Sequence, residues 1–136
     1  MTARRVGPVA LALVLVVACQ PRLTGPWEAA RERGVAYRAI GQEPGWVAEV
    51  DAGERPPMRV SLDYGQRRLH AGQTHRFEAP PTQTTEYRGT ADGTSVELRI
   101  RGEACRDSMS GEGFETRAEL VVNGATYRGC GRFLKR

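Results

Sequence analysis

The chain has 136 residues, of which 40% are hydrophobic and 26% are charged, and its formal net charge is +4. This length is sufficient for one domain with a single modest hydrophobic core. After residue 19 the chain carries 18 basic and 16 acidic residues, a formal charge of only +2, which argues against a nucleic-acid partner.

Residues 1–18 have the features of an export signal. Arg4 and Arg5 precede an apolar run from Val9 to Ala18, and a charged segment followed by a short apolar run is typical of secretory signals. The run is too short to span a bilayer, because a transmembrane helix needs about 20 apolar residues. We therefore expect this segment to be removed on export.

The end of this segment, Val16 to Cys19, resembles the lipobox of bacterial lipoproteins, in which a small residue precedes a lipidated cysteine. The resemblance implies that Cys19 carries diacylglycerol and an N-acyl chain such as palmitate, and acylation of this kind gives stable membrane anchoring. Gln20, rather than aspartate, follows the cysteine, which implies the outer membrane. The alternative is an ordinary signal peptide with an incidental cysteine.

Residues 19–34 are predicted to form a tether that carries one short helix. Pro26 suits the first position of a helix, and Glu28 and Arg31 lie one turn apart. Gly34 can end the helix, because glycine accepts the left-handed conformation common at that position.

From residue 35 the hydrophobic period changes to two, which predicts a β domain over residues 35–136 with seven to nine short strands. The alternation is clearest in three runs: Trp46, Ala48 and Val50; Met58, Val60, Leu62 and Tyr64; and Val96, Leu98 and Ile100. Turn signals separate the runs at residues 51–57, 71–74, 80–81 and 91–93. Ala91-Asp92-Gly93 fits a three-residue hairpin loop with glycine in the left-handed position.

An antiparallel set of strands with one apolar face must close or stack to bury that face. The expected fold is therefore all-β, either a small antiparallel barrel or a compact sandwich. Aromatic residues make up only 7% of the chain, so few large side chains are present to line a cavity. A filled interior is the preferred prediction.

The last predicted hairpin has its turn at Asn123-Gly124, the strongest short hairpin signal. A two-residue turn there predicts one apolar face and one outer face. The apolar pairs are Val122 with Ala125, Leu120 with Tyr127 and Ala118 with Gly129; the outer pairs are Glu119 with Arg128 and Arg117 with Cys130.

Cys105 and Cys130 remain as an even pair once Cys19 is assigned to the lipid. In an oxidising periplasm they should form a disulfide, worth roughly 3 kcal/mol in the chain-entropy model. The alternative is a redox or nucleophilic thiol. On the register above, the bridge lies outside the main core and holds the loop Arg106 to Phe114 against the final strand.

Three stretches are similar to a family of bacterial envelope lipoproteins, some of which are joined to META-type lipoprotein domains. They are Tyr37 to Trp46 (YRAIGQEPGW), Cys105 to Ser110 (CRDSMS) and Arg128 to Gly131 (RGCG). The family has no established activity to carry over. Gly45 stands where a bulky aromatic is usual in the family, and Ser108 where glycine is common.

Some of these residues also have a structural explanation. Glu43-Pro44 favours an extended approach to the next strand, and Trp46 is expected to be a large buried anchor. Gly129 is expected to let its strand pass closely beside Ala118.

The loop after Cys105 is the predicted binding region, because polar loops on rigid scaffolds often carry function. Its proposed binding residues are Arg106, Asp107, Ser108, Met109, Ser110 and Glu112. The alternative is that Asp107 and Ser108 only make local turn hydrogen bonds.

A second resemblance is to the membrane-bound inhibitors of c-type lysozyme, which are small disulfide-linked β-barrel lipoproteins. Their active loop contains a Ser-Gly-x-x-aromatic stretch that Ser110 to Phe114 partly matches. The loop arginine of those proteins is Gly113 here, so Arg106 or another arginine would have to enter the acidic cleft of lysozyme.

An enzymatic function is not expected, because no nucleophile with its base, phosphate loop or cofactor motif is evident. His70 and His75 would face each other if residues 71–74 formed a hairpin loop, giving half of a Zn²⁺ or Cu²⁺ site with Asp63 or Glu78. Two exposed hairpin histidines without metal are the preferred interpretation.

The expected function is therefore a non-catalytic binding or envelope-maintenance role, without a cofactor, for a lipoprotein anchored in the outer membrane and facing the periplasm. The partner would be an envelope protein, peptidoglycan or lysozyme. Inhibition of c-type lysozyme is the alternative function.

Overall fold

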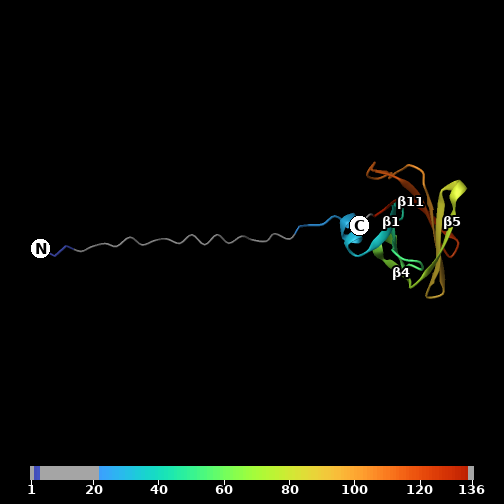
Figure 1. Ribbon diagram of the computed structural model, residues 1–136, viewed down its shortest axis with the longest axis horizontal. Coiled ribbons are helices and arrows are strands. Elements are labelled where there is room, and N and C mark those ends of the chain that lie inside the picture. The colour runs from blue at the N-terminus through green and yellow to red at the C-terminus, as the bar shows by residue number, and fades with distance from the viewer. Residues whose placement is uncertain (1, 4–21, 135–136) are drawn as a thin grey trace.

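The structure is a computed structural model that describes residues 2–3 and 22–134 (Figure 1). Cys19 and all of the predicted export signal except residues 2–3 lie outside the described residues. Within the described part, no helix combines the length and apolar character needed to cross a membrane.

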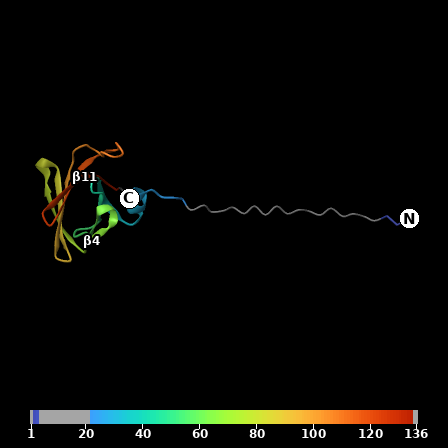
Figure 2. The same ribbon diagram turned by 180° about the vertical axis from the view of Figure 1, so that it is seen from behind.

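Nine strands form one antiparallel sheet, in the order β4-β3-β2-β1-β11-β10-β7-β6-β5. Their bounds are β1 (Val35–Gly41), β2 (Trp46–Asp51), β3 (Met58–Leu62), β4 (Arg67–Ala71), β5 (Thr74–Ala79), β6 (Thr84–Ala91), β7 (Thr94–Arg101), β10 (Thr116–Val122) and β11 (Ala125–Phe133). The remaining elements are the helix α1 (Pro26–Glu32), the 3-10 turns η1 (Asp63–Gly65) and η2 (Pro80–Thr82), and two short paired strands, β8 (Cys105–Arg106) and β9 (Gly113–Phe114). The sheet wraps into a nearly closed barrel, which confirms the predicted all-β fold (Figures 1 and 2).

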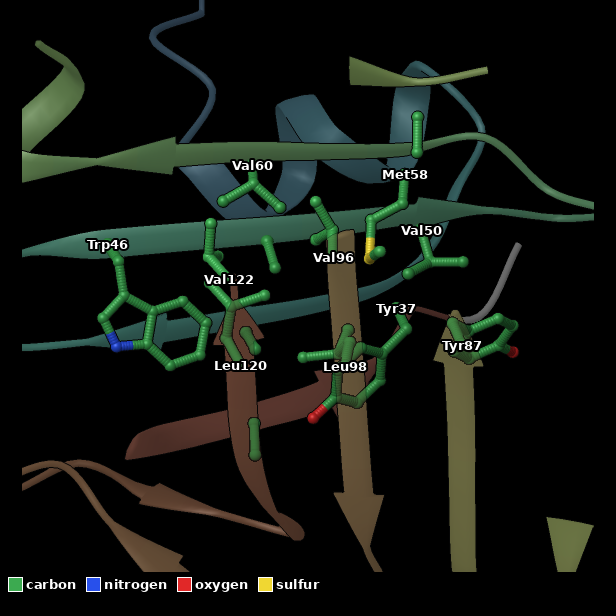
Figure 3. Close-up of a cluster of buried hydrophobic side chains, with 14 of the residues drawn as sticks. Tyr37, Trp46, Val50, Met58, Val60, Tyr87, Val96, Leu98, Leu120 and Val122 are labelled. Carbon is green, nitrogen blue, oxygen red and sulfur yellow. The ribbon is translucent and has the colours of Figure 1, made fainter. Parts of the chain in front are cut away.

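The interior of the barrel is filled by one cluster of side chains from every strand of the sheet except β5. Inward positions recur at every second residue, because successive side chains of a strand point to opposite faces. Figure 3 shows Trp46, Met58, Leu98 and Leu120 meeting in this cluster from strands in both halves of the sheet. The predicted inward runs of β2, β3 and β7 are buried.

A buried polar chain crosses this core at one place. Tyr37 donates a hydrogen bond to Thr116 Oγ1 at 2.8 Å, and Thr116 Oγ1 donates to the carbonyl of Gly131 at 2.7 Å. Burial raises the pKa of the Tyr37 phenol above its ordinary value. These two hydrogen bonds give the buried hydroxyl groups of Tyr37 and Thr116 their partners, and they link β1, β10 and β11.

The hairpin of β10 and β11 has the predicted register, with Val122 opposite Ala125 and Arg117 opposite Cys130. Asn123 and Gly124 have positive φ values of 46° and 84°, as a type I′ turn requires. The turn between β6 and β7 differs from the three-residue prediction. Ala91 pairs directly with Thr94, so Asp92-Gly93 is also a two-residue turn, because both residues accept positive φ.

The predicted helix forms over Pro26–Glu32, with Pro26 in its first turn and Arg31 paired with Glu28. Gly34 follows with a φ of 88°. The helix packs on β1. Its residue Trp27 joins a second apolar cluster outside the barrel, formed with Phe114, Cys105, Cys130 and Ile40.

Three local predictions are wrong. Tyr64 does not continue the third strand; it lies in η1 with a φ of 55° and is 74% exposed. Glu43 is not extended before Pro44, because it turns with a φ of 53° between β1 and β2. The close approach at Gly129 is to β1 rather than to Ala118: a Cβ on Gly129 would lie 1.9 Å from the carbonyl oxygen of Ile40.

β4 and β5 follow each other in the chain but lie at opposite edges of the sheet. The chain passes between them at a corner where Ala71 and Thr74 are buried beside Gly89 of β6. There is no β4–β5 hairpin, so the prediction that His70 faces His75 is wrong. His70 pairs with a residue of β3, and His75 with a residue of β6.

Candidate functional site

The disulfide between Cys105 and Cys130 forms as predicted, with the Cα atoms 5.6 Å apart. Cys130 points away from the barrel interior, so the bridge lies in the second apolar cluster. It holds the loop that follows Cys105 against β11. Within this loop, β8 and β9 pair antiparallel, with Cys105 opposite Phe114.

Asp107 organises the tip of the loop from a buried position, with 5% of its surface exposed. Its carboxylate accepts hydrogen bonds from the backbone N–H and the hydroxyl of Ser110, each at 2.8 Å. These bonds, the backbone one above all, lower the pKa of the Asp107 carboxyl below its ordinary value. Asp107 therefore makes the local turn hydrogen bonds that were the alternative for it, and its carboxylate is not among the loop side chains that face solvent.

The other predicted loop residues, Arg106, Ser108, Met109, Ser110 and Glu112, are exposed. Met109 is the most prominent, because it is a large apolar residue that is 70% exposed. Arg106 donates a hydrogen bond to the carbonyl of Gly111 at 2.6 Å, which places its guanidinium along the loop. The Ser110 hydroxyl already donates a hydrogen bond to Asp107. Arg106, Ser108 and Met109 are therefore the side chains best placed to contact a partner.

A second loop lies directly beside the disulfide loop. Gln42, in the turn between β1 and β2, donates a hydrogen bond to Asp107 Oδ1 at 3.4 Å. The same turn carries Gly45, and a Cβ at that position would lie 2.5 Å from the ring of Tyr64. The aromatic ring of Tyr64, which lies in η1, thus packs over Gly45.

Trp46 is the first residue of β2, and its indole ring lies over Gly41. A Cβ on Gly41 would lie 1.9 Å from the indole nitrogen. That nitrogen donates to the carbonyl of Arg128 at 3.3 Å. Gly41 is directly opposite Gly129 in the β1–β11 ladder. Gly41 therefore leaves the space that the buried indole fills, as the anchor role predicted for Trp46 requires, and Gly129 lets β11 approach the backbone of β1.

These contacts join the three stretches that resemble envelope lipoproteins. The first meets the second through Gln42 and Asp107, and it meets the third through Trp46 and Arg128. No protein-family model, curated protein or solved structure matches the chain. The resemblance stays a prediction, although its motifs form one continuous region.

Helix α1 supports this region from outside the barrel. The ring of Trp27 lies 5.4 Å from that of Phe114, and the guanidinium groups of Arg38 and Arg132 lie 5.2 and 4.7 Å from the Trp27 ring. Stacking between cations and an aromatic ring stabilises such a contact. Sequence reasoning missed Trp27 and Arg132, because hydrophobic periodicity describes single elements and these contacts join distant ones.

The remaining outer face of the sheet carries both signs of charge. Arg99 forms salt bridges with Glu97 and Glu119 at 2.6 and 3.0 Å, and Arg117 pairs with Glu103 at 2.8 Å. Opposite charges on neighbouring strands stabilise a sheet. Arg99 and Arg117 therefore have acidic partners on this face, and Arg101 and Arg128 lie beside them.

The hypothesis of a metal site is not supported by the geometry of its proposed ligands. His70 and His75 lie on strands at opposite edges of the sheet. Among residues 2–3 and 22–134, no group of three or more histidine, cysteine, aspartate or glutamate residues is arranged to hold a metal ion.

Proposed function

We propose that this protein is a lipoprotein anchored in the outer membrane, facing the periplasm, and that its disulfide-linked loop binds an envelope partner without catalysis. The lipobox-like stretch ending at Cys19 and the export signal before it support the location. The disulfide between Cys105 and Cys130 supports an oxidising compartment.

The construction of the loop is the observation that carries the binding role. Three features hold the loop in one conformation: the disulfide, the β8–β9 pair and the hydrogen bonds of the buried Asp107. A loop ordered before binding loses less conformational entropy when a partner arrives. Arg106 and Met109 nevertheless face solvent, and exposed arginine and methionine are enriched at interfaces.

Inhibition of c-type lysozyme is the second function, and one observation favours it. Arg106 is an exposed cation outside the stretch that resembles the inhibitors, but its guanidinium lies beside Gly111 of that stretch. A guanidinium in this position is suited to the carboxylates of an acidic cleft. Lysozyme is therefore included in the test.

The location is tested by labelling cells with radioactive palmitate. The wild-type protein should be labelled and should sediment with membranes, whereas Cys19→Ser should lose both properties. Labelling of the Cys19→Ser protein at the wild-type level would contradict the lipidation of Cys19.

The binding role is tested by capture of partners from envelope extract on the full-length protein, beside an assay of lysozyme inhibition. Arg106→Ala and Met109→Ala should each reduce capture, while Arg68→Ala, an exposed arginine on β4, should not. Inhibition at stoichiometric protein that is lost in Arg106→Ala would favour the second function. Equal capture by all variants would place the interface outside the loop.

A further inference from the structure

β5 is an edge strand whose free side is uncovered in the described part of the chain. Among residues 22–134, its sole strand partner is β6. Five consecutive residues, His75 to Ala79, are exposed although their side chains alternate between the two faces. Apart from the β5–β6 ladder, no backbone–backbone hydrogen bond within residues 22–134 involves them, although the carbonyl of Ala79 accepts a hydrogen bond from the Thr82 hydroxyl at 3.1 Å. Such an edge is a template for another strand.

The side chains of β5 identify the strand that would complement it. Arg76 and Glu78 share one face and form an ion pair with each other, and Phe77 lies between them on the other face. If two copies of β5 pair antiparallel with Phe77 opposite Phe77 of the partner subunit, Arg76 of each copy faces Glu78 of the other. This register therefore creates two favourable charge pairs at once.

Phe77 is the apolar element of the same edge. It is 48% exposed, and the guanidinium of Arg88 lies 4.7 Å from its ring. In the self-paired register the two phenylalanine rings lie on one face across the symmetry axis, each with its Arg88. Directly opposed aromatic residues are a stabilising cross-strand pair.

The other edge of the sheet cannot form the equivalent contact. β4 carries Arg67, Arg68 and His70 and has no acidic residue, so pairing of two β4 strands would create no pair of opposite charges. Pairing of β4 with β5 of another copy would be heterologous, a contact that leads to rings or open filaments. In both views of the molecule β5 lies on the side of the domain farthest from helix α1, so the helix leaves this edge free (Figures 1 and 2).

We propose that β5 is the interface of a homodimer. Two copies pair their β5 strands antiparallel about a two-fold axis at Phe77, and the two nine-stranded sheets continue as one. This inference uses only the described β5 edge and is independent of the proposed function.

The register is tested by cysteine cross-linking of purified full-length protein under mild oxidation. Directly opposite residues of an antiparallel sheet form either a hydrogen-bonded or a non-hydrogen-bonded pair. In both, their Cα atoms are about 4.5 to 5.5 Å apart, a separation that a disulfide spans. Phe77→Cys should therefore give a covalent dimer on non-reducing gels. Wild type controls for any contribution of Cys19, and Arg68→Cys controls for an exposed cysteine on the other edge.

Charge reversal then tests the pairing itself in the Phe77→Cys background. Arg76→Glu or Glu78→Arg alone opposes two pairs of like charges and should lower the dimer yield about tenfold. The double variant Arg76→Glu with Glu78→Arg recreates the pairs with the charges exchanged and should restore the yield. Both positions are exposed, so these variants should fold.

Several results would overturn the proposal. One is a yield of covalent dimer from Phe77→Cys that is no higher than the yield from wild type or Arg68→Cys. Another is a dimer yield from the double variant that stays as low as the yields from the two single variants. A measurement without any substitution provides a further check: sedimentation equilibrium of the wild-type protein should show a dimer whose population rises with concentration, and a monomer throughout would contradict the interface.

Discussion

At the residue scale, Asp107 links the ionisation of one side chain to the order of the disulfide loop. Its pKa in the folded protein is lowered by hydrogen bonds from Ser110. A lowered pKa in the folded state means that the ionised form stabilises folding. That stabilisation is complete above the unfolded pKa, about 3.9 for aspartate, and is lost as the pH falls through the folded value.

Asp107→Asn should therefore destabilise the protein in a pH-dependent way. At pH 7 the free energy of unfolding should fall by about 1 to 2 kcal/mol, because a charge-assisted hydrogen bond is replaced by a neutral one. Below the pKa of Asp107 the wild type is protonated and the difference should shrink. Urea unfolding of both proteins at pH 7 and at low pH measures this; a difference that grows on acidification would contradict the assignment.

Substitutions of Arg106 and Trp46 should affect binding and stability differently. Arg106→Ala should change the melting temperature little while weakening partner capture, because its side chain is exposed and makes one local hydrogen bond. Trp46→Ala should cost about 3 to 5 kcal/mol, because it empties a buried site beside Gly41. Thermal unfolding and capture, measured on both variants, should give opposite patterns. Unfolding of Arg106→Ala would assign that residue a structural role.

At the element scale, the approach of β1 to β11 depends on the glycines that face each other in the ladder. A Cβ on Gly129 would overlap the Ile40 carbonyl, and a Cβ on Gly41 would overlap Trp46. Backbone atoms cannot move aside as a flexible side chain can. The two strands therefore hold the indole, and with it the turn that reaches Asp107.

Gly129→Ala should separate β1 from β11 and lower the free energy of unfolding by about 3 kcal/mol, the upper range for overpacking. Gly113→Ala is the matched control in the same disulfide-linked region, because a Cβ there meets nothing within 4 Å. Chemical denaturation of both variants tests the difference. Equal stability would show that the β1–β11 contact can relax around a methyl group.

At the scale of the whole molecule, two apolar clusters on opposite sides of the sheet stabilise the domain. The large cluster fills the barrel, and the small one joins helix α1, the loop and β11 through Trp27, Phe114 and the disulfide. A chain of this length buries a limited core. The covalent link in the second cluster is therefore a substantial part of the total stability.

Removing the disulfide should lower the free energy of unfolding by about 3 kcal/mol, since the bridge closes a loop between residues separated by 25 positions. The double variant Cys105→Ala with Cys130→Ala and the reduced wild type should unfold at the same lower denaturant concentration. Reductant should not affect the double variant. Neither Cys105 nor Cys130 of the denatured, unreduced wild type should react with maleimide; a reactive thiol at either position would contradict the pairing.

Local patterns were sufficient to predict the class of fold, the helix and the last hairpin. Alternating apolar residues define which face of a strand is buried, and Asn123-Gly124 determines the register of its two strands because a two-residue turn leaves no freedom. The disulfide followed from an even pair of cysteines. These features depend on residues that are close in the chain or on simple pairing, so the sequence alone determines them.

Contacts between distant segments were decided only by the tertiary structure. Spacing could not reveal that Asp107 is buried under Gln42, that Tyr64 covers Gly45, or that Trp27 reaches Phe114. A hairpin at residues 71–74 was the condition for His70 to face His75, yet Ala71 and Thr74 turn the chain at a corner beside Gly89. Closure of the sheet around one core fixes these positions, because each buried side chain must fit what the other strands leave.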